Sequence, residues 1–357
     1  MKAKAIVYCE KEFGKMDGKT ANGLVRHSEK YEIACVIDST KAGMDAGEYL
    51  DGVKNGIPIF HDFDDAVERL KEIPNYFIYG VAPLDAFLKE EQRKILLEAM
   101  EKGMNIVNGL HEFFTDDEEF TQKAEECGVK IYDVRKPLAK KELHIFSGRI
   151  LKVNIPIVAV LGTDSAVGKR TTSIILVEAL RKVGLNVAFV ATGQTGLIQG
   201  AKYGVAVDAI VEEFMTGEIE NAVMKAYDTE HPDIIIVEGQ GAISHPAYLS
   251  PCAIVRGAKP KAIIVQHSPK RKNLGDFPYI PMPTLKSEIE MIEIFSRSEV
   301  IAITINHEDM TDEEIKEVIT EYEKMFQLLT TDVLKYGCEK LVKGIFKAFP
   351  ELPKNSD

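Results

Sequence analysis

The chain has 357 residues, of which 45% are hydrophobic and 28% are charged, and its formal net charge is −12. This length is too great for one ordinary hydrophobic core and favours two domains, while the composition is that of a globular protein. The acidic excess argues against a protein that binds nucleic acid through a broad basic face.

Cysteine usage and hydropathy bear on where the protein works. The five cysteines are scattered and never spaced as CxxC, which is typical of reduced thiols in the cytoplasm. No apolar stretch approaches membrane-spanning length, and the apolar run near the start is too short for a signal peptide. We therefore expect a cytoplasmic protein that does not bind membranes. We further expect it to act on a small molecule, to bind no nucleic acid and to form a homo-oligomer.

The first 150 residues alternate short β-branched segments with longer amphipathic segments, which is the pattern of βα units around a parallel sheet. They predict a Rossmann-like domain over residues 1–150, although no GxGxxG motif follows the first strand. Asp38 ends the second predicted strand, where it either takes a ribose hydroxyl or caps the next turn. The predicted strands cover residues 4–9, 31–38, 76–82, 104–109 and 129–134, and predicted helices cover 63–73 and 88–103.

The alternation starts again after a basic, proline-containing stretch, and we place the domain boundary near residue 150. The second half predicts a doubly wound parallel sheet of the P-loop NTPase type over residues 151–350, followed by a loose tail over 351–357. An amphipathic helix is predicted over 311–326, with Thr311 or Asp312 as its cap. The predicted strands cover residues 155–162, 186–192, 233–239, 261–267 and 300–306.

The segment LGTDSAVGKRTT, residues 161–172, joins a buried predicted strand to a predicted helix. Its two glycines allow successive backbone amides to face one point, and the start of the helix adds positive potential. This pattern predicts a phosphate-binding loop, and the alternative is a glycine-rich turn without a ligand. The predicted phosphate-binding residues are Gly162, Thr163, Asp164, Ser165, Ala166, Val167, Gly168, Lys169, Arg170 and Thr171.

Within this segment, GTDSAVGK closely resembles the loop of dethiobiotin synthetase, which also places five residues between its glycines. The similarity covers about residues 155–310, and it implies that Glu238 and Asp208 face a metal and that Asn306 reads an adenine edge. Dethiobiotin synthetase has threonine after the loop lysine, where the hydroxyl binds the metal, whereas this chain has Arg170. The substrate-side lysine after the second strand is also missing. These departures argue against dethiobiotin synthesis and weaken the case for Mg-ATP.

Polar side chains follow the predicted strands of the second half, at the edge where parallel sheets bind ligands. His245 and His267 are candidates for a general base, because an imidazole is partly neutral near pH 7. His307 is either a further member of this group or structural. Lys270 and Arg271 lie in a basic, proline-rich loop, which is either a solvated loop or a clamp for an anionic substrate.

Five segments spread over nearly the whole chain share one resemblance: VIDSTKAGMDAGE, IVNGLHEFFTDDEEFTQKAEECGVKIYDVRKP, GTDSAVGKRTT, VEGQGAISHP and QHSPKRK. They resemble the DgcN-type D-glutamate N-acetyltransferases. The resemblance implies transfer of an acetyl group from acetyl-CoA to the amine of a D-amino acid such as D-glutamate. One departure is GVAPLDAFLKEEQ, where a Gly-Gly pair is expected after Ala-Pro, and it bears on which substrate this member takes.

The resemblance to these acetyltransferases implies that the loop with Lys169 holds the diphosphate of coenzyme A. His245 or His267 would then be the base, and Lys270 or Arg271 would hold the substrate carboxylates. Two rival functions stay open. Glu238 and Asp208 favour a Mg-ATP-dependent ligase or kinase acting on a small carboxylate, and the loop would also suit a non-catalytic nucleotide sensor.

Overall fold

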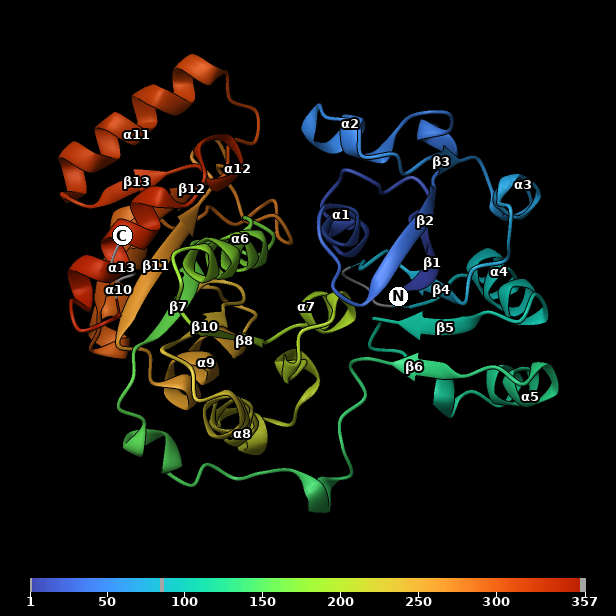
Figure 1. Cartoon of the computed structure of the whole chain (residues 1–357), viewed down its shortest axis with the longest axis horizontal. Helices are drawn as coiled ribbons and strands as arrows, with labels where there is room; N and C mark the ends of the chain where they lie inside the picture. The colour runs from blue at the N-terminus through green and yellow to red at the C-terminus, as the bar shows by residue number, and fades with distance from the viewer. Residues whose placement is uncertain (1, 84–86, 354–357) are drawn as a thin grey trace. The chain divides into compact units, whose positions relative to one another are not determined.

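A computed structural model describes residues 2–83 and 87–353 of the chain, which is shown in Figure 1. The position of the missing Gly-Gly pair, Leu84 and Asp85, and the last four residues of the predicted tail lie outside the described residues. The chain forms two compact units, Met1–Pro137 with Gln194–Ala201, and Leu138–Gly193 with Lys202–Asp357. Within the part that the structure describes, no helix is long and apolar enough to cross a membrane.

The first unit is built on a six-stranded sheet in the order β3-β2-β1-β4-β5-β6, which is the strand order of a Rossmann fold. All its strand pairs are parallel, as the sequence predicted. The two-residue edge strand β3 was not predicted, because so short a segment shows no periodicity. The strands are β1 (Ala3–Tyr8), β2 (Tyr31–Ile37), β3 (Ile59–Phe60), β4 (Tyr76–Tyr79), β5 (Asn105–Asn108) and β6 (Ile131–Asp133).

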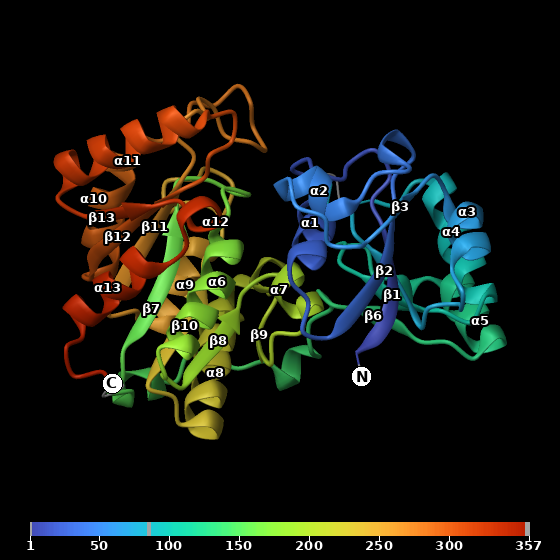
Figure 2. The same cartoon turned by 45° about the horizontal axis from the view of Figure 1, so that its top comes forward.

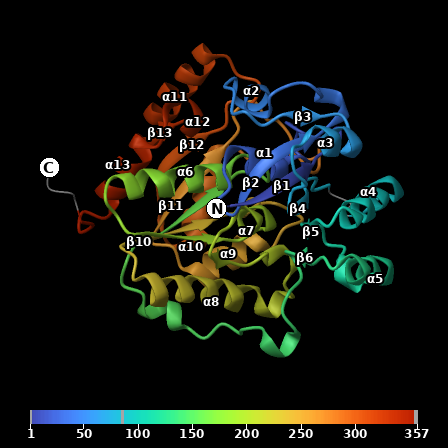
Figure 3. The same cartoon turned by 45° about the vertical axis from the view of Figure 1, so that its right-hand side comes forward.

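The helices of the first unit include both that were predicted, and the C-terminal end of α4 lies just before Gly103, which has a positive φ of 80°. Figure 3 shows α4 and α5 side by side. The helices are α1 (Lys19–Arg26), α2 (Ala46–Asp51), α3 (Phe63–Arg69), α4 (Glu90–Glu101), α5 (Glu118–Cys127) and α7 (Gln194–Gln199), with short 3₁₀ turns η1 (Ser39–Lys41) and η2 (Phe114–Asp116).

Helix α7 belongs to the first unit although it follows β8 in the chain. The hydroxyls of Thr195 and Thr20 are 2.9 Å apart, and the Gln199 amide donates to the Gly23 and His27 carbonyls at 2.7 and 2.6 Å. Ile198 is buried in the core of this unit. Helix α7 is therefore fastened along α1 by side chains that the sequence pattern did not single out.

The second unit is built on a seven-stranded parallel sheet in the order β13-β12-β11-β7-β10-β8-β9, which Figure 2 shows. Strand β7 lies between β11 and β10, so the loop that follows β7 is flanked by the ends of two other strands. The short strands β9 and β13 were not predicted. The strands are β7 (Ile157–Gly162), β8 (Val187–Ala191), β9 (Tyr203–Gly204), β10 (Ile234–Glu238), β11 (Ala262–His267), β12 (Glu299–Ile305) and β13 (Leu329–Thr331).

Helices cover both faces of this sheet. Residues of α6 and α13 pack in one apolar cluster on one face, and residues of α8, α9, α10 and α11 pack in another on the opposite face. The helices are α6 (Lys169–Lys182), α8 (Glu212–Glu230), α9 (Ser250–Ala258), α10 (Leu285–Ser296), α11 (Asp312–Phe326), α12 (Val333–Tyr336) and α13 (Glu339–Ala348), with 3₁₀ turns η3 (Lys140–Glu142), η4 (Arg149–Lys152) and η5 (Val207–Ala209). Thr311 caps α11, as predicted.

The stretch before β7 belongs to the second unit, whereas the sequence placed the boundary near residue 150. The carboxylates of Glu218 and Glu220, both on α8, accept hydrogen bonds from the backbone amides of His144 and Ser147, each at 2.6 Å. These bonds hold the basic stretch against α8. Because its fixing points lie on a helix about 70 residues later, composition alone did not reveal them.

Candidate functional site

The predicted phosphate-binding loop runs from Gly162, the last residue of β7, to Lys169, the first residue of α6. Ala166 and Gly168 have positive φ angles of 50° and 110°, and such left-handed steps turn backbone amides toward one side. A Cβ atom at Gly162 would stand 2.7 Å from the Gln266 carbonyl oxygen, so only glycine fits there. The strand, turn and helix that a phosphate-binding loop requires are all present.

Three side chains at the start of α6 make hydrogen bonds within the second unit. The Lys169 ammonium donates a hydrogen bond to the backbone carbonyl of Asp164, so it lies over the loop. The Thr172 hydroxyl donates to Oε1 of Gln266 on β11 at 2.5 Å, and the Ser173 hydroxyl donates to the Lys169 carbonyl at 2.8 Å. The Lys169 side chain therefore lies over the loop, with its ammonium on a backbone carbonyl.

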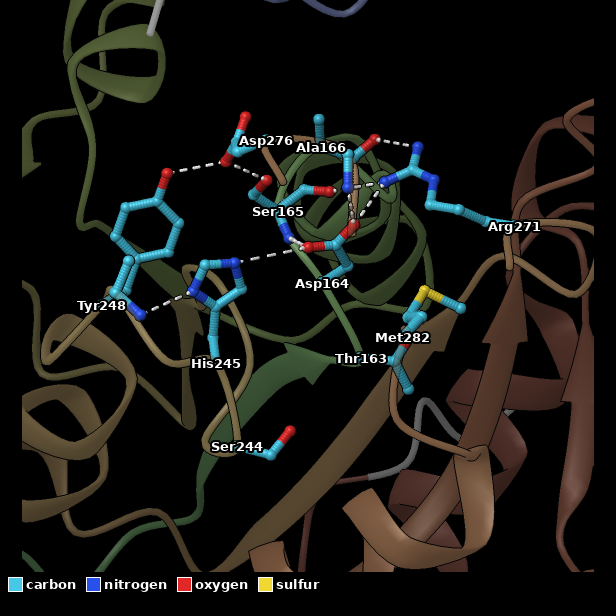
Figure 4. A network of polar contacts seen from close by, with 12 residues as sticks. Thr163, Asp164, Ser165, Ala166, Ser244, His245, Tyr248, Arg271, Asp276 and Met282 are labelled. Atoms are coloured by element: carbon cyan, nitrogen blue, oxygen red, sulfur yellow. Dashed lines mark hydrogen bonds and ion pairs between the residues drawn. The ribbon is translucent and has the colours of Figure 1, made fainter. Parts of the chain in front are cut away.

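A carboxylate inside the loop organises the surrounding polar network, which Figure 4 shows. Asp164 is fully buried, and its oxygens accept from the backbone amides of Ser165 at 2.7 Å and Gly275 at 2.8 Å. The Arg271 guanidinium donates to the same carboxylate at 2.9 Å, to the Ser165 carbonyl at 2.9 Å and to Glu308 at 2.8 Å. The structure therefore brings Arg271 onto the loop.

His245 faces this carboxylate from the segment after β10. Its Nε2 atom lies 3.9 Å from Oδ1 of Asp164, and its ring stacks on Tyr248 with centroids 4.3 Å apart. Nδ1 accepts from the Ala247 amide at 3.2 Å, so in the neutral ring the proton is assigned to Nε2. Burial lowers the pKa of His245, while the charges of Asp164 and Asp276 oppose that effect.

The Nε2 atom of His245 is buried and has no hydrogen-bond partner among the described residues. Its neighbour Tyr248 donates at 2.7 Å to Asp276, which also accepts from the Ser165 hydroxyl at 2.6 Å. Sequence reasoning missed Tyr248 and Asp276, because both lie in irregular segments whose place depends on tertiary packing. The only signal was a Gly-Asp pair at 275–276 within the proline-rich loop.

His267 lies on the other side of the loop. Its Nδ1 atom is 2.9 Å from the Thr163 hydroxyl, so Thr163 and Asp164, consecutive in the chain, connect the loop to the two histidines. Burial, with a further effect of the Arg271 charge, lowers the pKa of His267 to about 4. This imidazole is therefore neutral at pH 7.

Three other predicted residues have partners elsewhere in the second unit. Lys270 forms an ion pair with Glu314 in the first turn of α11, so the structure does not join it to the Asp164 network. His307 bonds Asp332 at 2.7 Å, in line with the structural role left open for it. The Asn306 side chain accepts from the Glu308 amide at 3.1 Å.

The two carboxylates predicted to face a metal, Glu238 and Asp208, have different partners. Glu238 is buried at the end of β10, where it accepts from the Thr192 amide at 3.0 Å. Burial raises the pKa of Glu238, and the positive charges of Arg170 and Lys169 oppose this. Asp208 lies in η5 and acts electrostatically on Tyr248. Within residues 2–83 and 87–353, no group of three or more His, Cys, Asp or Glu side chains could hold a metal ion.

Comparison with known proteins agrees with the two-domain fold and the loop. A family model described as a domain of unknown function (DUF1611_C), P-loop domain, matches residues 144–342. The corresponding Rossmann-like domain (DUF1611_N) matches residues 39–137. The chain belongs to the DUF1611 family. A crystal structure of a DUF1611 family protein from Anabaena variabilis is similar with a TM-score of 0.88 and 29% identity, over 97% of this chain and 99% of that one.

Two relatives of this DUF1611 chain carry an enzyme name. A D-glutamate N-acetyltransferase from Pseudoalteromonas sp. is 30% identical over 276 residues, which cover 75% of this chain and 80% of that protein. Another from Tritonibacter scottomollicae is 29% identical over 274 residues, with the same coverage. The family resemblance found in the sequence is thus confirmed.

Proposed function

We propose that this DUF1611 protein is an N-acetyltransferase that moves an acetyl group from acetyl-CoA to the amine of a D-amino acid such as D-glutamate. The names of its relatives support this reaction class. The observation that carries the site is the buried Nε2 of His245, which faces the loop carboxylate without a hydrogen-bond partner in the described structure. An unpaired buried polar atom costs about 1–3 kcal/mol, so we infer that a bound substrate supplies the partner.

The loop suits the diphosphate of coenzyme A. Left-handed steps at Ala166 and Gly168 direct backbone amides to one side, and the N-terminus of α6 adds positive potential. The Lys169 ammonium lies over the loop and needs only to exchange the Asp164 carbonyl for a phosphate oxygen. These donors favour an anion and require no particular nucleoside.

The reaction needs a proton acceptor and an oxyanion donor. The substrate ammonium loses a proton, its nitrogen attacks the thioester carbonyl carbon to form the C–N bond, and the resulting tetrahedral oxyanion collapses with cleavage of the C–S bond. The coenzyme A thiolate leaves and takes up a proton, and the nitrogen loses a second one. We assign proton acceptance to neutral His267, and we assign the oxyanion contact to the Nε2–H of His245, since its Nδ1 already accepts from Ala247.

Arg271 links substrate binding to the basicity of His267. Its positive charge contributes to the low pKa of that histidine. A substrate carboxylate that pairs with the Arg271 guanidinium would offset this charge and raise the proton affinity of the imidazole. The base would then become stronger when an acidic amino acid is bound, which favours D-glutamate over amines without a side-chain carboxylate.

The test is an assay with acetyl-CoA and a panel of D- and L-amino acids, in which free thiol is followed and the N-acetyl product is identified by mass. We expect turnover with D-glutamate, and a loss of about 100-fold or more in kcat for His245→Gln and for His267→Gln. His231→Asn is the matched control, because His231 is exposed at the end of α8 in a left-handed conformation that Asn tolerates. No transfer to any amine, or full activity in both site variants, would refute the proposal.

A Mg-ATP-dependent ligase or kinase acting on a small carboxylate is the second candidate. Buried Glu238, beside the loop at the end of β10, favours it. Release of ADP from ATP that needs both magnesium and a carboxylate, without acetyl-CoA, would support this enzyme. Tight ATP binding without turnover would instead support a nucleotide sensor.

A further inference from the structure

Arg170 stands where most phosphate-binding loops carry a metal ligand. The residue directly after the loop lysine is ordinarily Ser or Thr, and its hydroxyl binds the Mg²⁺ that accompanies a nucleotide. Here that residue is Arg170, in the first turn of α6. The next two hydroxyls with defined partners, on Thr172 and Ser173, already donate to Gln266 and to the Lys169 carbonyl. The position directly after the loop lysine therefore supplies no hydroxyl ligand for a magnesium ion.

The direction of the Arg170 side chain follows from helix geometry. Residues two apart lie about 200° apart around an α-helix, so Arg170 and Thr172 leave α6 on opposite sides. The Thr172 side chain reaches Gln266 on β11, which is paired with β7 on one side. Arg170 is therefore directed toward the other neighbour of β7, which is β10.

Glu238 ends β10 on that side. Its carboxylate is buried and accepts from the Thr192 amide at 3.0 Å. The positive charges of Arg170 and Lys169 lower the pKa of Glu238, against the larger effect of burial, which raises it. A buried carboxylate is costly unless it is paired, and a guanidinium is a planar donor that can serve a carboxylate and a phosphate oxygen together.

We propose that the Arg170 guanidinium, opposite Glu238, takes the place of the magnesium ion, so that this loop binds a diphosphate without a divalent cation. The choice of coenzyme A as the natural ligand rests on the proposed function, whereas independence from metal rests on Arg170 and Glu238. Acetyl transfer from a thioester breaks no phosphate bond, so no charge develops on the diphosphate that a metal would have to stabilise. A positive charge beside the diphosphate, here that of Arg170, is needed only to bind the ligand.

The test is calorimetric titration of the purified full-length protein with coenzyme A and, separately, with ADP, each in EDTA and in excess Mg²⁺. For the wild type we expect each Kd to change by less than about twofold between the two buffers. Arg170→Thr restores the usual hydroxyl, so we expect binding in EDTA to weaken by about tenfold or more and ADP binding to recover with Mg²⁺. Arg170→Lys keeps the charge and should remain independent of metal.

Lys182→Thr is the matched control, since it removes a positive charge from the exposed end of the same helix and should leave both Kd values unchanged. Circular dichroism checks that each variant is folded. A wild type that needs Mg²⁺ for either ligand overturns the proposal, as does Mg²⁺-dependent binding that Thr171→Ala abolishes, or binding of neither ligand. If the protein bound ADP without metal but did not bind coenzyme A, the proposal of metal-free diphosphate binding would stand. Acetyl-CoA would then be rejected as the donor.

Discussion

The two units have the same kind of parallel sheet, but the polar groups at the carboxyl edges of the two sheets are used differently. In the first unit, Asp38 accepts from Thr40 and Phe13 amides at 2.9 and 3.1 Å and pairs with Lys41 at 3.0 Å. Of its two predicted roles, Asp38 thus has the capping one. In the second unit, groups from separate loops converge on Asp164, and the Nε2 of His245 has no partner among the residues described.

This difference indicates where the chemistry lies. The Asp38 carboxylate is already engaged by its own turn and by the amide of Phe13, so it stabilises these two loops and has little capacity left for a ligand. The Asp164 carboxylate is held by Arg271 and by the amide of Gly275, more than 100 residues away, and it joins the loops that follow the paired strands β7 and β11. The variants below test two expectations. Substitutions at the sheet edge of the first unit should affect only folding, whereas those at the sheet edge of the second unit should affect both folding and activity.

The largest effect is expected for Arg271→Ala. It leaves the fully buried Asp164 without its cation, and removing one partner of a buried pair costs about 3–5 kcal/mol. Acetyl transfer should fall with it. Lys270→Ala is the adjacent control: its pair with Glu314 is exposed, so about 0–1 kcal/mol is expected. Urea unfolding of both variants measures these changes in the free energy of unfolding. Equal losses in the two variants would contradict the assignment of Arg271, and not Lys270, to the loop.

Acid sensitivity of His267 should be the next largest effect. Because the folded protein holds its pKa at about 4, below the ordinary value of 6.5, folding disfavours the protonated ring. This contribution to stability is fully present above pH 6.5 and is lost as the pH falls toward 4, by about 3 kcal/mol. His267→Gln should flatten the stability profile over that range, measured by denaturant unfolding at several pH values. An unchanged slope would show that His267 is not the group that titrates.

Asp38→Asn tests the first unit. Asparagine keeps an oxygen for the Thr40 amide but removes the charge opposite buried Lys41, so we expect a loss of about 2 kcal/mol. Burial raises the pKa of Asp38, but bonds from Thr40 and Lys41 outweigh it and lower the pKa overall. Stability from this group is therefore lost as the pH falls below the ordinary carboxyl range, and the variant should lack that loss. Its kcat and KM should equal those of the wild type, whereas Asp164→Asn should lower activity.

The long strands and the loop could be predicted from sequence, because each has a local cause. Strands such as β7 and β10 are buried on both faces and therefore form continuous apolar runs. Gly162 and Gly168 are demanded by close approach to Gln266 and by a positive φ, which only glycine meets without cost. The edge strands β3, β9 and β13 have two or three residues each and leave no such pattern.

The rest of the candidate site depends on which loops meet in space. Arg271 and Lys270 are adjacent in a basic loop and looked equivalent, yet one reaches Asp164 and the other pairs with Glu314 on α11. Tyr248 and Asp276 are 28 residues apart, with α9 and β11 between them, and they meet through a side-chain hydrogen bond. Charge and spacing cannot distinguish such neighbours, because the outcome depends on packing over the sheet edge.

Thr311→Ala is expected to have the smallest effect and sharpens the distinction between Lys270 and Arg271. The Thr311 hydroxyl accepts from the Glu314 amide at 3.3 Å while Glu314 accepts from the Thr311 amide at 2.9 Å, and loss of such a cap costs about 1 kcal/mol. Glu314 also holds Lys270, so the variant loosens the anchor of that lysine without touching the loop. If Lys270 contributed to the ligand site, KM for the amino acid would change together with stability. We expect thermal unfolding to shift slightly and KM to stay constant, because the substrate anion would meet Arg271 instead.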